Sequence, residues 1–405
     1  KTMNEIKIKS GLDIGNGYVK GEILQNEFFR NGESISVPSV VSSFSNPNSI
    51  LAESSDAIRS TISNLYNKMD VSFSSAVISN TGRFLVGAKA IAEGDMNTTF
   101  DVNTHQSKAQ QELSFILALA TLGATALKAY FDKNNQLPGE IVKAEVDVVL
   151  ALPITEFQRE KELYEKGFIN NTHIVTFHNF KNLVRVELSF KHVIVVSEGA
   201  CGQFALSHDV SLLENSYKNT DEPNENIAAE KNVIGIDVGE GTVNFAVMRD
   251  ESFSPTASKT LINGFGTVLE RVVDNSTEVA QHNITTRDGL GDFLVQGLHS
   301  GAKNRYNLIK SIVLKESVPF VNSIVKRLNK ILASGNTGLF TTVIYVYGGG
   351  SIFIKDLLYP LLVDNIEDND LKIVYINEKY ARLVNLRGLS MIASANFNDN
   401  LSEND

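Results

Sequence analysis

The sequence is poor in cysteine, since Cys201 is its only one in 405 residues. A single cysteine cannot form an internal disulfide, which suits a reducing compartment such as the cytoplasm. No stretch approaches the roughly 18 apolar residues that a membrane-spanning helix needs. The beginning of the sequence also lacks the charged and then apolar pattern of a secretory signal. We therefore expect a cytoplasmic protein with no membrane partner.

An excess of positive charge is lacking too. Lys and Arg number 37 against 47 Asp and Glu, which gives a formal net charge of −10. No cluster of Lys and Arg interrupts this acidic balance, so direct binding to nucleic acid is not expected. The seven histidines show no spacing typical of metal ligands. The chain is ordinary in its apolar content of 42% and long enough for two domains.

Two stretches of the chain are versions of each other. Residues 11–20 read Gly-Leu-Asp-Ile-Gly-Asn-Gly-Tyr-Val-Lys, and residues 235–244 read Gly-Ile-Asp-Val-Gly-Glu-Gly-Thr-Val-Asn, 224 residues later. Each pattern predicts a buried strand that carries one Asp, then a Gly-x-Gly turn and a second strand (residues 18–24 and 242–248). A glycine hairpin alone is common without any ligand, but its repetition favours a shared binding role.

The residue types in these hairpins suit a bound phosphate. Glycine at the turns lets main-chain N–H groups approach a phosphate with no Cβ in the way. Asp13 and Asp237 are costly to bury in ionised form without a cation. Mg²⁺ held through water by such a carboxylate is the usual partner of a nucleotide phosphate. We therefore expect the two hairpins to hold one polyphosphate from both sides.

Two further places carry residues suited to a binding site. A predicted strand at 192–197 ends at Glu198, where a helix begins, and this position faces the crevice in which open α/β sheets bind ligands. The alternative is a Glu that is favoured at a helix N-terminus by the helix dipole. Gly348 to Gly350 follow a predicted strand at 342–347 and precede a helix through Leu362. Such glycines permit close backbone contact with a flat ligand.

The first half of the chain contains strong periodic segments. Residues 107–131 predict an apolar core helix, and the nearly continuous apolar run 145–153 predicts a central strand. Thr155-x-x-Gln158 is a capping box that predicts a helix through Lys166. Residues 172–177 and 183–190 predict two further strands. The polar, Ser/Asn-rich region from about 30 to 105 predicts a small inserted subdomain outside the main sheet.

The second half begins after an acidic, Asn-rich stretch at 209–232, which predicts a linker. Residues 267–335 are helical by spacing, and Pro319 should kink or divide the last of these helices. Residues 371–376 predict one more strand. A closing helix is predicted at 380–395, with Gly388 inside it.

These landmarks, in this order, resemble the actin-like ATPase superfamily, which includes actin, the Hsp70 ATPase domain, sugar kinases and bacterial actin homologues. The resemblance implies an α/β, two-domain actin-like ATPase fold, built from duplicated RNase H-like domains with mixed sheets and small inserted subdomains. Domain I would comprise 1–208 and 380–405, with its insert at about 30–105. Domain II would comprise 233–379, with a helical insert at about 267–335, after the linker at 209–232.

The resemblance also implies roles for the site residues. ATP or ADP would bind with Mg²⁺ between the domains, and GTP is a possible substitute. Asp13 and Asp237 would hold Mg²⁺ through water and act in catalysis together with Glu198, which resembles the residue that positions the attacking water. The nucleotide would be bound by the two hairpins and the triple glycine: Gly15, Asn16, Gly17, Tyr18, Lys20, Gly239, Glu240, Gly241, Thr242, Gly348, Gly349 and Gly350.

Within the superfamily the chain most resembles the bacterial plasmid-segregation actin homologues (ParM-like). Hsp70 is disfavoured because no substrate-binding domain follows residue 405, and neither the inserts nor the acceptor base of a sugar kinase is evident. The resemblance implies a filament of identical subunits that hydrolyses ATP after polymerisation and is captured by a DNA-binding centromere adaptor. The alternatives are a small-molecule kinase of the same fold and a non-polymerising, nucleotide-dependent binding module.

Overall fold

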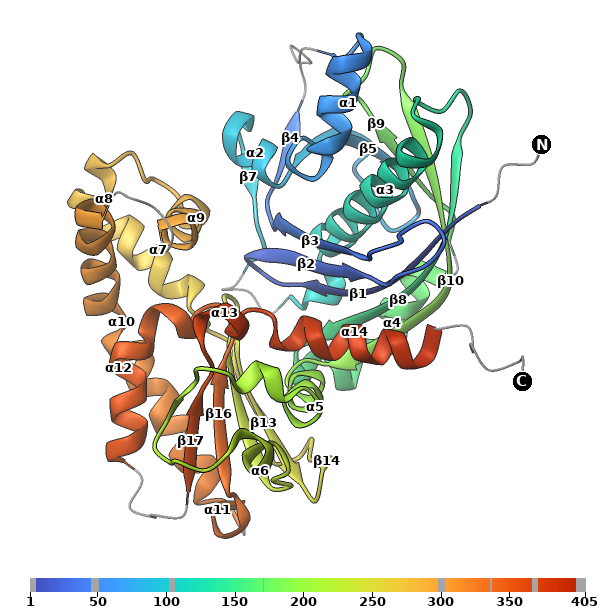
Figure 1. The fold of residues 1–405 in the computed structure, drawn as a ribbon. Coiled ribbons are helices and arrows are strands. Elements are labelled where there is room, and N and C mark those ends of the chain that lie inside the picture. Colours follow the sequence, from blue (N-terminus) through green and yellow to red (C-terminus); the bar gives the residue numbers. More distant parts are fainter. Residues whose placement is uncertain are drawn as a thin grey trace, which may run out of the picture.

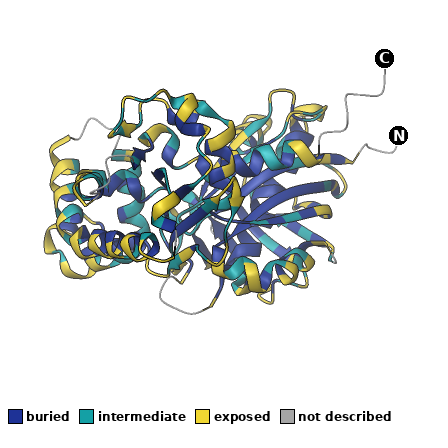
Figure 2. Cartoon of the chain, turned by 90° about the horizontal axis from the view of Figure 1, so that it is seen from below, coloured by how far each residue is buried: buried dark blue, intermediate teal, exposed yellow. Residues whose placement is uncertain are grey.

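The protein forms two β-sheets that lie side by side and are joined through helices at the centre of the molecule (Figure 1). The computed structural model describes residues 5–44, 51–101, 106–169, 171–297, 303–335, 337–365 and 371–397. Buried residues concentrate in the strands and in the helix faces that cover them, as Figure 2 shows.

The first sheet contains ten strands within the described residues, in the order β3-β2-β1-β8-β10-β9-β5-β6-β4-β7. Strands β1, β8 and β10 are parallel, and β1, β2 and β3 form an antiparallel meander. The bounds are β1 Ile6–Ile14, β2 Tyr18–Ile23, β3 Glu33–Pro38, β4 Val41–Phe44, β5 Asp70–Ser74, β6 Arg83–Val86, β7 Asn97–Thr98, β8 Val142–Leu152, β9 His173–Phe177 and β10 Val184–Ser197.

The second sheet has the described order β11-β17-β16-β12-β13-β14, with β15 also paired to β13. Strands β12, β16 and β17 are parallel, and β12, β13 and β15 form an antiparallel meander. The bounds are β11 Tyr217–Lys218, β12 Val233–Val238, β13 Val243–Arg249, β14 Ser252–Phe253, β15 Lys259–Leu261, β16 Val343–Tyr347 and β17 Lys372–Tyr375.

The internal repeat extends well beyond the two glycine turns. The strand series β3-β2-β1-β8-β10 and β15-β13-β12-β16-β17 have the same order and the same parallel and antiparallel neighbours. The registers of the two hairpins also agree, because equivalent residues face each other: Asp13 lies opposite Lys20, and Asp237 lies opposite Asn244. The predicted α/β fold with two duplicated mixed sheets is thus confirmed.

Helices cover both faces of each sheet. The helical bounds are α1 Ser55–Ser63, α2 Ala88–Glu93, α3 Glu112–Asn134, α4 Ile154–Ile169, α5 Ala200–His208, α6 Asn224–Ala228, α7 Gly266–Asn275, α8 Thr277–Gln281, α9 Arg287–Gly297, α10 Lys303–Leu332, α11 Thr337–Phe340, α12 Ser351–Asp364, α13 Glu378–Ala381 and α14 Val384–Phe397. Short 3₁₀ turns lie at Leu65–Asn67, Lys108–Gln110 and Val210–Leu213.

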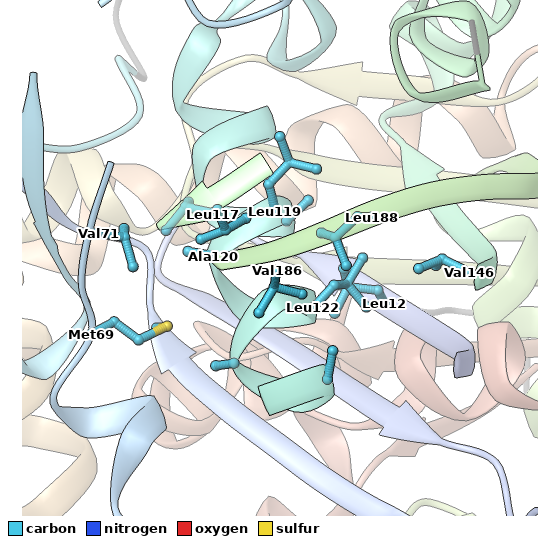
Figure 3. Close-up of a cluster of buried hydrophobic side chains, with 14 of the residues drawn as sticks. Leu12, Met69, Val71, Leu117, Leu119, Ala120, Leu122, Val146, Val186 and Leu188 are labelled. Atoms are coloured by element: carbon cyan, nitrogen blue, oxygen red, sulfur yellow. The ribbon is translucent and has the colours of Figure 1, made fainter. Parts of the chain in front are cut away.

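Side chains on β8 alternate between two hydrophobic cores because successive residues of a strand point to opposite faces. Val146 and Val148 pack in the core that includes α3 and α4, whereas Val149 and Ala151 pack against α5 and α14. Figure 3 shows the core on the α3 side, where helix residues meet strand residues such as Leu188. Helix α14, near the end of the chain, therefore covers the second face of the first sheet.

Helix α3 corrects the statement that no stretch of the chain could span a membrane. Its length and its mean hydropathy of 1.5 meet the requirement, and it is the one described helix that does so. However, 94% of its most apolar window is buried inside the protein. The helix packs against β1, β8 and β10, as the prediction of a core helix requires.

Two predictions from local composition are wrong. The region from about 30 to 105 does not lie outside the main sheet, because β5 pairs with β9 and carries β6, β4 and β7 with it. The acidic segment 209–232 is not a free linker, because it supplies the edge strand β11 and buries Leu213 and Ile227. In both cases tertiary pairing outweighs a polar local composition.

Three boundaries also differ from expectation. The strands predicted at 183–190 and 192–197 are one strand, β10, with a register shift between Phe190 and His192. Helix α10 continues through Pro319, so of the two predicted effects of this proline, a kink or a division, the division does not occur. Helix α4 begins at Ile154, so Thr155 lies inside it and does not cap it.

Candidate functional site

A cavity of about 910 Å³, including its open mouth, lies between the two sheets. It is lined by every residue that the sequence assigned to catalysis, nucleotide binding or metal binding. Those residues come from the hairpins β1–β2 and β12–β13, the β10–α5 junction and the β16–α12 junction. The fold therefore brings all four sequence motifs to one place.

The two glycine turns have the same backbone geometry. The N–H of Gly15 donates to the carbonyl of Tyr18 at 3.0 Å, and that of Gly239 to the carbonyl of Thr242 at 2.9 Å. These bonds close equivalent turns at equivalent positions of the repeat. The first glycine turn that lines the cavity thus has a structural copy in the second glycine turn.

The turns also reach into each other. A Cβ on Gly241 would lie 1.6 Å from the amide nitrogen of Asn16, and a Cβ on Gly17 would lie 1.8 Å from a carboxylate oxygen of Glu240. Each middle residue therefore occupies the space left open by the second glycine of the opposite turn. The glycines serve this close approach between the halves as well as any contact with phosphate.

The two hairpin aspartates have different partners. Asp13 accepts a bond from Lys20 Nζ at 2.8 Å, and the same ammonium donates to the carbonyl of Arg382 at 3.0 Å. Asp237 accepts a bond from Asn385 Nδ2 at 2.7 Å. Lys20 and Asn385 both line the cavity. Asp13 is therefore neutralised by an ammonium group, whereas Asp237 is hydrogen-bonded by a neutral amide.

Glu198 lies at the end of β10 with 7% of its surface exposed. Its Oε1 accepts a bond from Lys108 Nζ at 2.6 Å, and its Oε2 accepts one from Asn244 Nδ2 at 3.0 Å. Lys108 belongs to the first half of the chain and Asn244 to β13 in the second sheet. The carboxylate is therefore held by donors from both halves of the molecule.

Burial dominates the electrostatics of the cavity. Burial, with the nearby charge of Glu198, raises the pKa of Asp237 to about 7 against the opposing bond from Asn385. Burial also raises the pKa of Glu240 to about 7 against the opposing charge of Arg287. Burial alone would lower the pKa of Lys108, but neighbouring carboxylates led by Glu198 reverse the shift and raise it.

A surplus of buried carboxylates suits a cation that arrives with an anionic ligand. No group of three or more His, Cys, Asp or Glu among the described residues is arranged to hold a metal ion directly. Asp13 and Asp237 can instead contact a hydrated ion, which keeps several of its waters when the ion is Mg²⁺. The donor set fits a magnesium ion shared with phosphate oxygens.

The triple glycine forms one wall of the cavity. Gly348 has a φ of +95°, and a Cβ there would lie 2.4 Å from Asp237 Oδ1. Four apolar side chains line the cavity near this wall: Phe265, Leu269, Val295 and Phe353. The rings of Phe265 and Phe353 stack with their centres 5.7 Å apart. Backbone without side chains beside an apolar wall suits a flat ring such as a purine.

Comparison with known proteins supports this architecture. Residues 11–200 match the family model described as the N-terminal domain of actin-like proteins. The actin-like protein Alp7A has a crystal structure with a TM-score of 0.69 and 13% identity, covering 96% of this chain and 97% of that one. The chain has an actin-like fold. A comparison with curated protein sequences gave no match.

Other structures of the same actin-like fold are ParM proteins. Bacillus thuringiensis ParM with ATP has a TM-score of 0.59 at 16% identity, covering 96% of this chain and 99% of that one. A 15-stranded ParM filament from Clostridium botulinum has a TM-score of 0.58 at 18% identity, covering 97% and 100%. The resemblance inferred from the sequence motifs is thereby confirmed.

Arg287, at the start of α9, connects the two halves of the molecule beside the cavity. Its guanidinium lies 3.3 Å from Glu240 in the second hairpin turn and 3.0 Å from Glu270 in α7. The same group donates to the carbonyl of Phe100, in the first half of the chain, at 3.4 and 3.5 Å. A single buried side chain thus joins the second glycine hairpin to Phe100 in the first half of the chain.

Tyr18 makes a second connection across the cleft. Its hydroxyl donates to Asp292 of α9 at 3.0 Å, and the Arg382 guanidinium lies over its ring at 4.8 Å. Burial, and then the charge of Asp292, raises the pKa of Tyr18 well above its usual range. Tyr18 therefore stays a neutral donor at any ordinary pH.

Sequence reasoning missed several residues that complete the site. Asn244 follows the repeat, since it occupies the position in the second hairpin that Lys20 occupies in the first, and a full alignment of the two stretches would have found it. Lys108 and Asn385 lie far along the chain from every glycine motif. Arg287 lies in the region 267–335, for which the sequence predicts only helices. No local pattern distinguishes these three from surface residues.

Proposed function

We propose that this chain binds Mg-ATP in the cleft between its sheets and hydrolyses it. The observation that carries the proposal is the convergence of two copies of one glycine hairpin and of Glu198 on a single cavity. The proposal is further supported by the ParM structures of the same fold, whose titles name ATP, ADP and AMPPNP as ligands. GTP remains a second candidate nucleotide.

In the proposed mechanism the two turns bind the β- and γ-phosphates through backbone N–H groups, as glycine-rich turns do. Mg²⁺, held through water by Asp13 and Asp237, would neutralise charge on the phosphates. Glu198 orients the attacking water toward the γ-phosphate, and the remaining cavity wall at Gly348 to Gly350 packs against the base and ribose. Positioning and electrostatics supply most of the rate enhancement in phosphoryl transfer.

We further propose that the protein assembles into filaments in the cytoplasm, hydrolyses ATP after assembly and moves plasmid DNA. This step is supported by the Clostridium botulinum ParM filament with the same fold. A DNA-binding adaptor, and not the chain itself, would contact the DNA, which agrees with the net charge of −10. We keep domain I at 1–208 plus 380–405 and domain II at 233–379 as the proposed division.

The test is light scattering recorded together with phosphate release after Mg-ATP is added to the purified protein without any other substrate. The expected result is a rise in scattering above a critical protein concentration, with phosphate released during or after assembly. Hydrolysis that appears only when a small hydroxylated acceptor is added would instead make the protein a kinase. Nucleotide binding with neither scattering nor hydrolysis would make it a binding module.

A further inference from the structure

We propose that Lys108 is a positioning residue that fixes the orientation of the Glu198 carboxylate, with Asn244 as the second donor. The inference rests on the proposed function, because it concerns how Glu198 is set up for hydrolysis. Lys108 is not part of any motif in the hairpins or the triple glycine. It reaches the site from the 3₁₀ turn at Lys108–Gln110 that precedes α3.

The geometry leaves Glu198 little freedom. Lys108 Nζ lies 2.6 Å from one carboxylate oxygen, and Asn244 Nδ2 lies 3.0 Å from the other. Thr260 donates its hydroxyl to Asn244 Oδ1 at 2.9 Å and so fixes which end of that amide faces Glu198. Each carboxylate oxygen has a second lone-pair site. The two donors thus set the plane of the carboxylate and leave lone pairs for a water molecule.

Lys108 is itself held in place by helix α4. Its backbone N–H donates to Glu156 Oε2 at 2.9 Å, and the hydroxyl of the preceding residue, Ser107, bonds to Glu160. Glu156 and Glu160 lie one helical turn apart on α4 and therefore face the same side. The turn that carries Lys108 is thus fastened at two points. The Lys108 ammonium group is therefore held in place as a hydrogen-bond donor to Glu198.

The buried carboxylates around Glu198 require the ammonium group of Lys108 as a counter-charge. Lys108 is 5% exposed and Glu198 is 7% exposed, so solvent screens neither of them well. The charge of Glu198 also acts on titratable groups of α4, β12, α5 and β16, and that of Asp13 in β1 acts on Lys108. The groups affected by Glu198 are Glu156, Tyr164, Asp237, Cys201 and Tyr347. Lys108 is the cation in direct contact with Glu198 among the described salt bridges. Removal of one partner of a buried ion pair leaves an uncompensated charge.

The first experiment compares steady-state ATP hydrolysis of the wild type with that of Lys108→Met. We expect kcat to fall at least tenfold while KM changes less than threefold, because the substitution removes the donor that orients the Glu198 carboxylate. Lys128→Met is the matched control. Lys128 lies on α3, forms an ion pair with Glu33 of β3 and does not line the cavity. A rise in KM with an unchanged kcat would overturn the proposal and make Lys108 a phosphate-binding residue.

The second experiment needs no hydrolysis and therefore separates this proposal from the proposed function. Melting temperatures are measured without nucleotide for the wild type, Lys108→Met, Glu198→Gln and the double variant. We expect Lys108→Met to lower the melting temperature by several degrees and the added Glu198→Gln to recover most of that loss. Additive effects of the two substitutions would show that the residues do not interact and would overturn the proposal, whether or not the wild type hydrolyses ATP.

Discussion

Four acidic residues, Asp13, Glu198, Asp237 and Glu240, line the cavity together with three cations, Lys20, Lys108 and Arg382. Each of the two lysines pairs with one carboxylate and Arg287 pairs with Glu240, whereas among the described residues Asp237 is bonded to an amide donor. Its raised pKa of about 7, caused first by burial and then by Glu198, is the result. At the residue scale the cavity is therefore short of one positive charge, which a hydrated cation can supply.

Glu198→Ala should separate assembly from hydrolysis. The substitution removes the group proposed to orient the attacking water, so phosphate release should fall by about 100-fold or more, the usual range for such groups. ATP binding and the scattering signal should persist, because neither hairpin is altered. The measurement is phosphate release alongside light scattering. Normal phosphate release by this variant would exclude Glu198 from the catalytic role.

Glu156→Gln should alter how the stability of the protein depends on pH. Burial raises the pKa of Glu156 to about 7, and Lys108 opposes that shift. Between its ordinary pKa and about 7 the unfolded chain has lost this proton and the folded protein has kept it, so stability falls as pH rises through this window. Gln at this position removes the effect.

Glu156→Gln should therefore be more stable than the wild type by about 1–2 kcal/mol at pH 8, allowing for solvent that reaches the half-buried carboxyl, and no more stable at pH 4. Urea unfolding at the two pH values measures the difference. Glu162→Gln on the exposed side of the same helix is the control. An equal gain for Glu156→Gln at both pH values would contradict the assigned cause.

How far the site could be predicted depends on the kind of residue. The glycines, Asp13 and Asp237 lie in a pattern that the chain repeats, so the sequence itself shows that they belong together. Lys108 and Arg287 act through single long side chains from distant segments, and only the folded structure shows what they reach. Their pairing with acidic groups depends on burial, which no local spacing encodes.

At the scale of elements, helices α5 and α14 cross in direct backbone contact. A Cβ on Gly388 of α14 would lie 2.0 Å from the carbonyl oxygen of Cys201 in α5. A Cβ on Gly11 of β1 would likewise lie 2.6 Å from the backbone nitrogen of Ser390. Helix α14 therefore fits closely against both its neighbouring helix and the sheet that it covers.

Gly388→Ala should consequently destabilise the protein. The added methyl meets backbone and not the end of a flexible side chain, so the helices must move apart, at a cost of about 1–3 kcal/mol. Thermal unfolding measures the loss. Gly139→Ala is the control, because a Cβ there meets nothing within 4 Å. Equal stability of the two variants would mean that the crossing is looser than described.

Elements were predicted well where periodicity was strong and poorly where composition alone was used. The apolar runs at 107–131 and 145–153 predicted the bounds of α3 and β8 to within a few residues. The polar segment at 209–232 reads as a linker, yet its few apolar residues are the ones that pack, as Leu213 and Ile227 do. A short edge strand such as β11 needs only two paired residues and leaves no periodic pattern.

At the scale of the molecule, Arg287 connects the two halves beside the cavity. Arg287→Ala should remove the bonds to Phe100 and the ion pairs with Glu240 and Glu270. We expect a larger radius of gyration without nucleotide and about tenfold weaker ATP binding, since hydrogen bonds to charged groups contribute about 1.5–3 kcal/mol.

Small-angle scattering and nucleotide titration test this expectation. Arg271→Ala is the matched control, because Arg271 lies on α7 and donates to the carbonyl of Glu316 on the exposed surface of the second half. An unchanged radius together with unchanged affinity would show that the Arg287 bridge does not hold the cleft closed.

The return of the last helix to the first sheet has a consequence for how the chain can be cut. Helix α14 packs on β1 and β8 although it follows every strand of the second sheet in the chain, so the two halves are interlocked. A protease nick in the 209–232 segment would leave two fragments that stay together as a non-covalent complex. Conversely, an N-terminal fragment expressed alone would expose the apolar face of its sheet and aggregate.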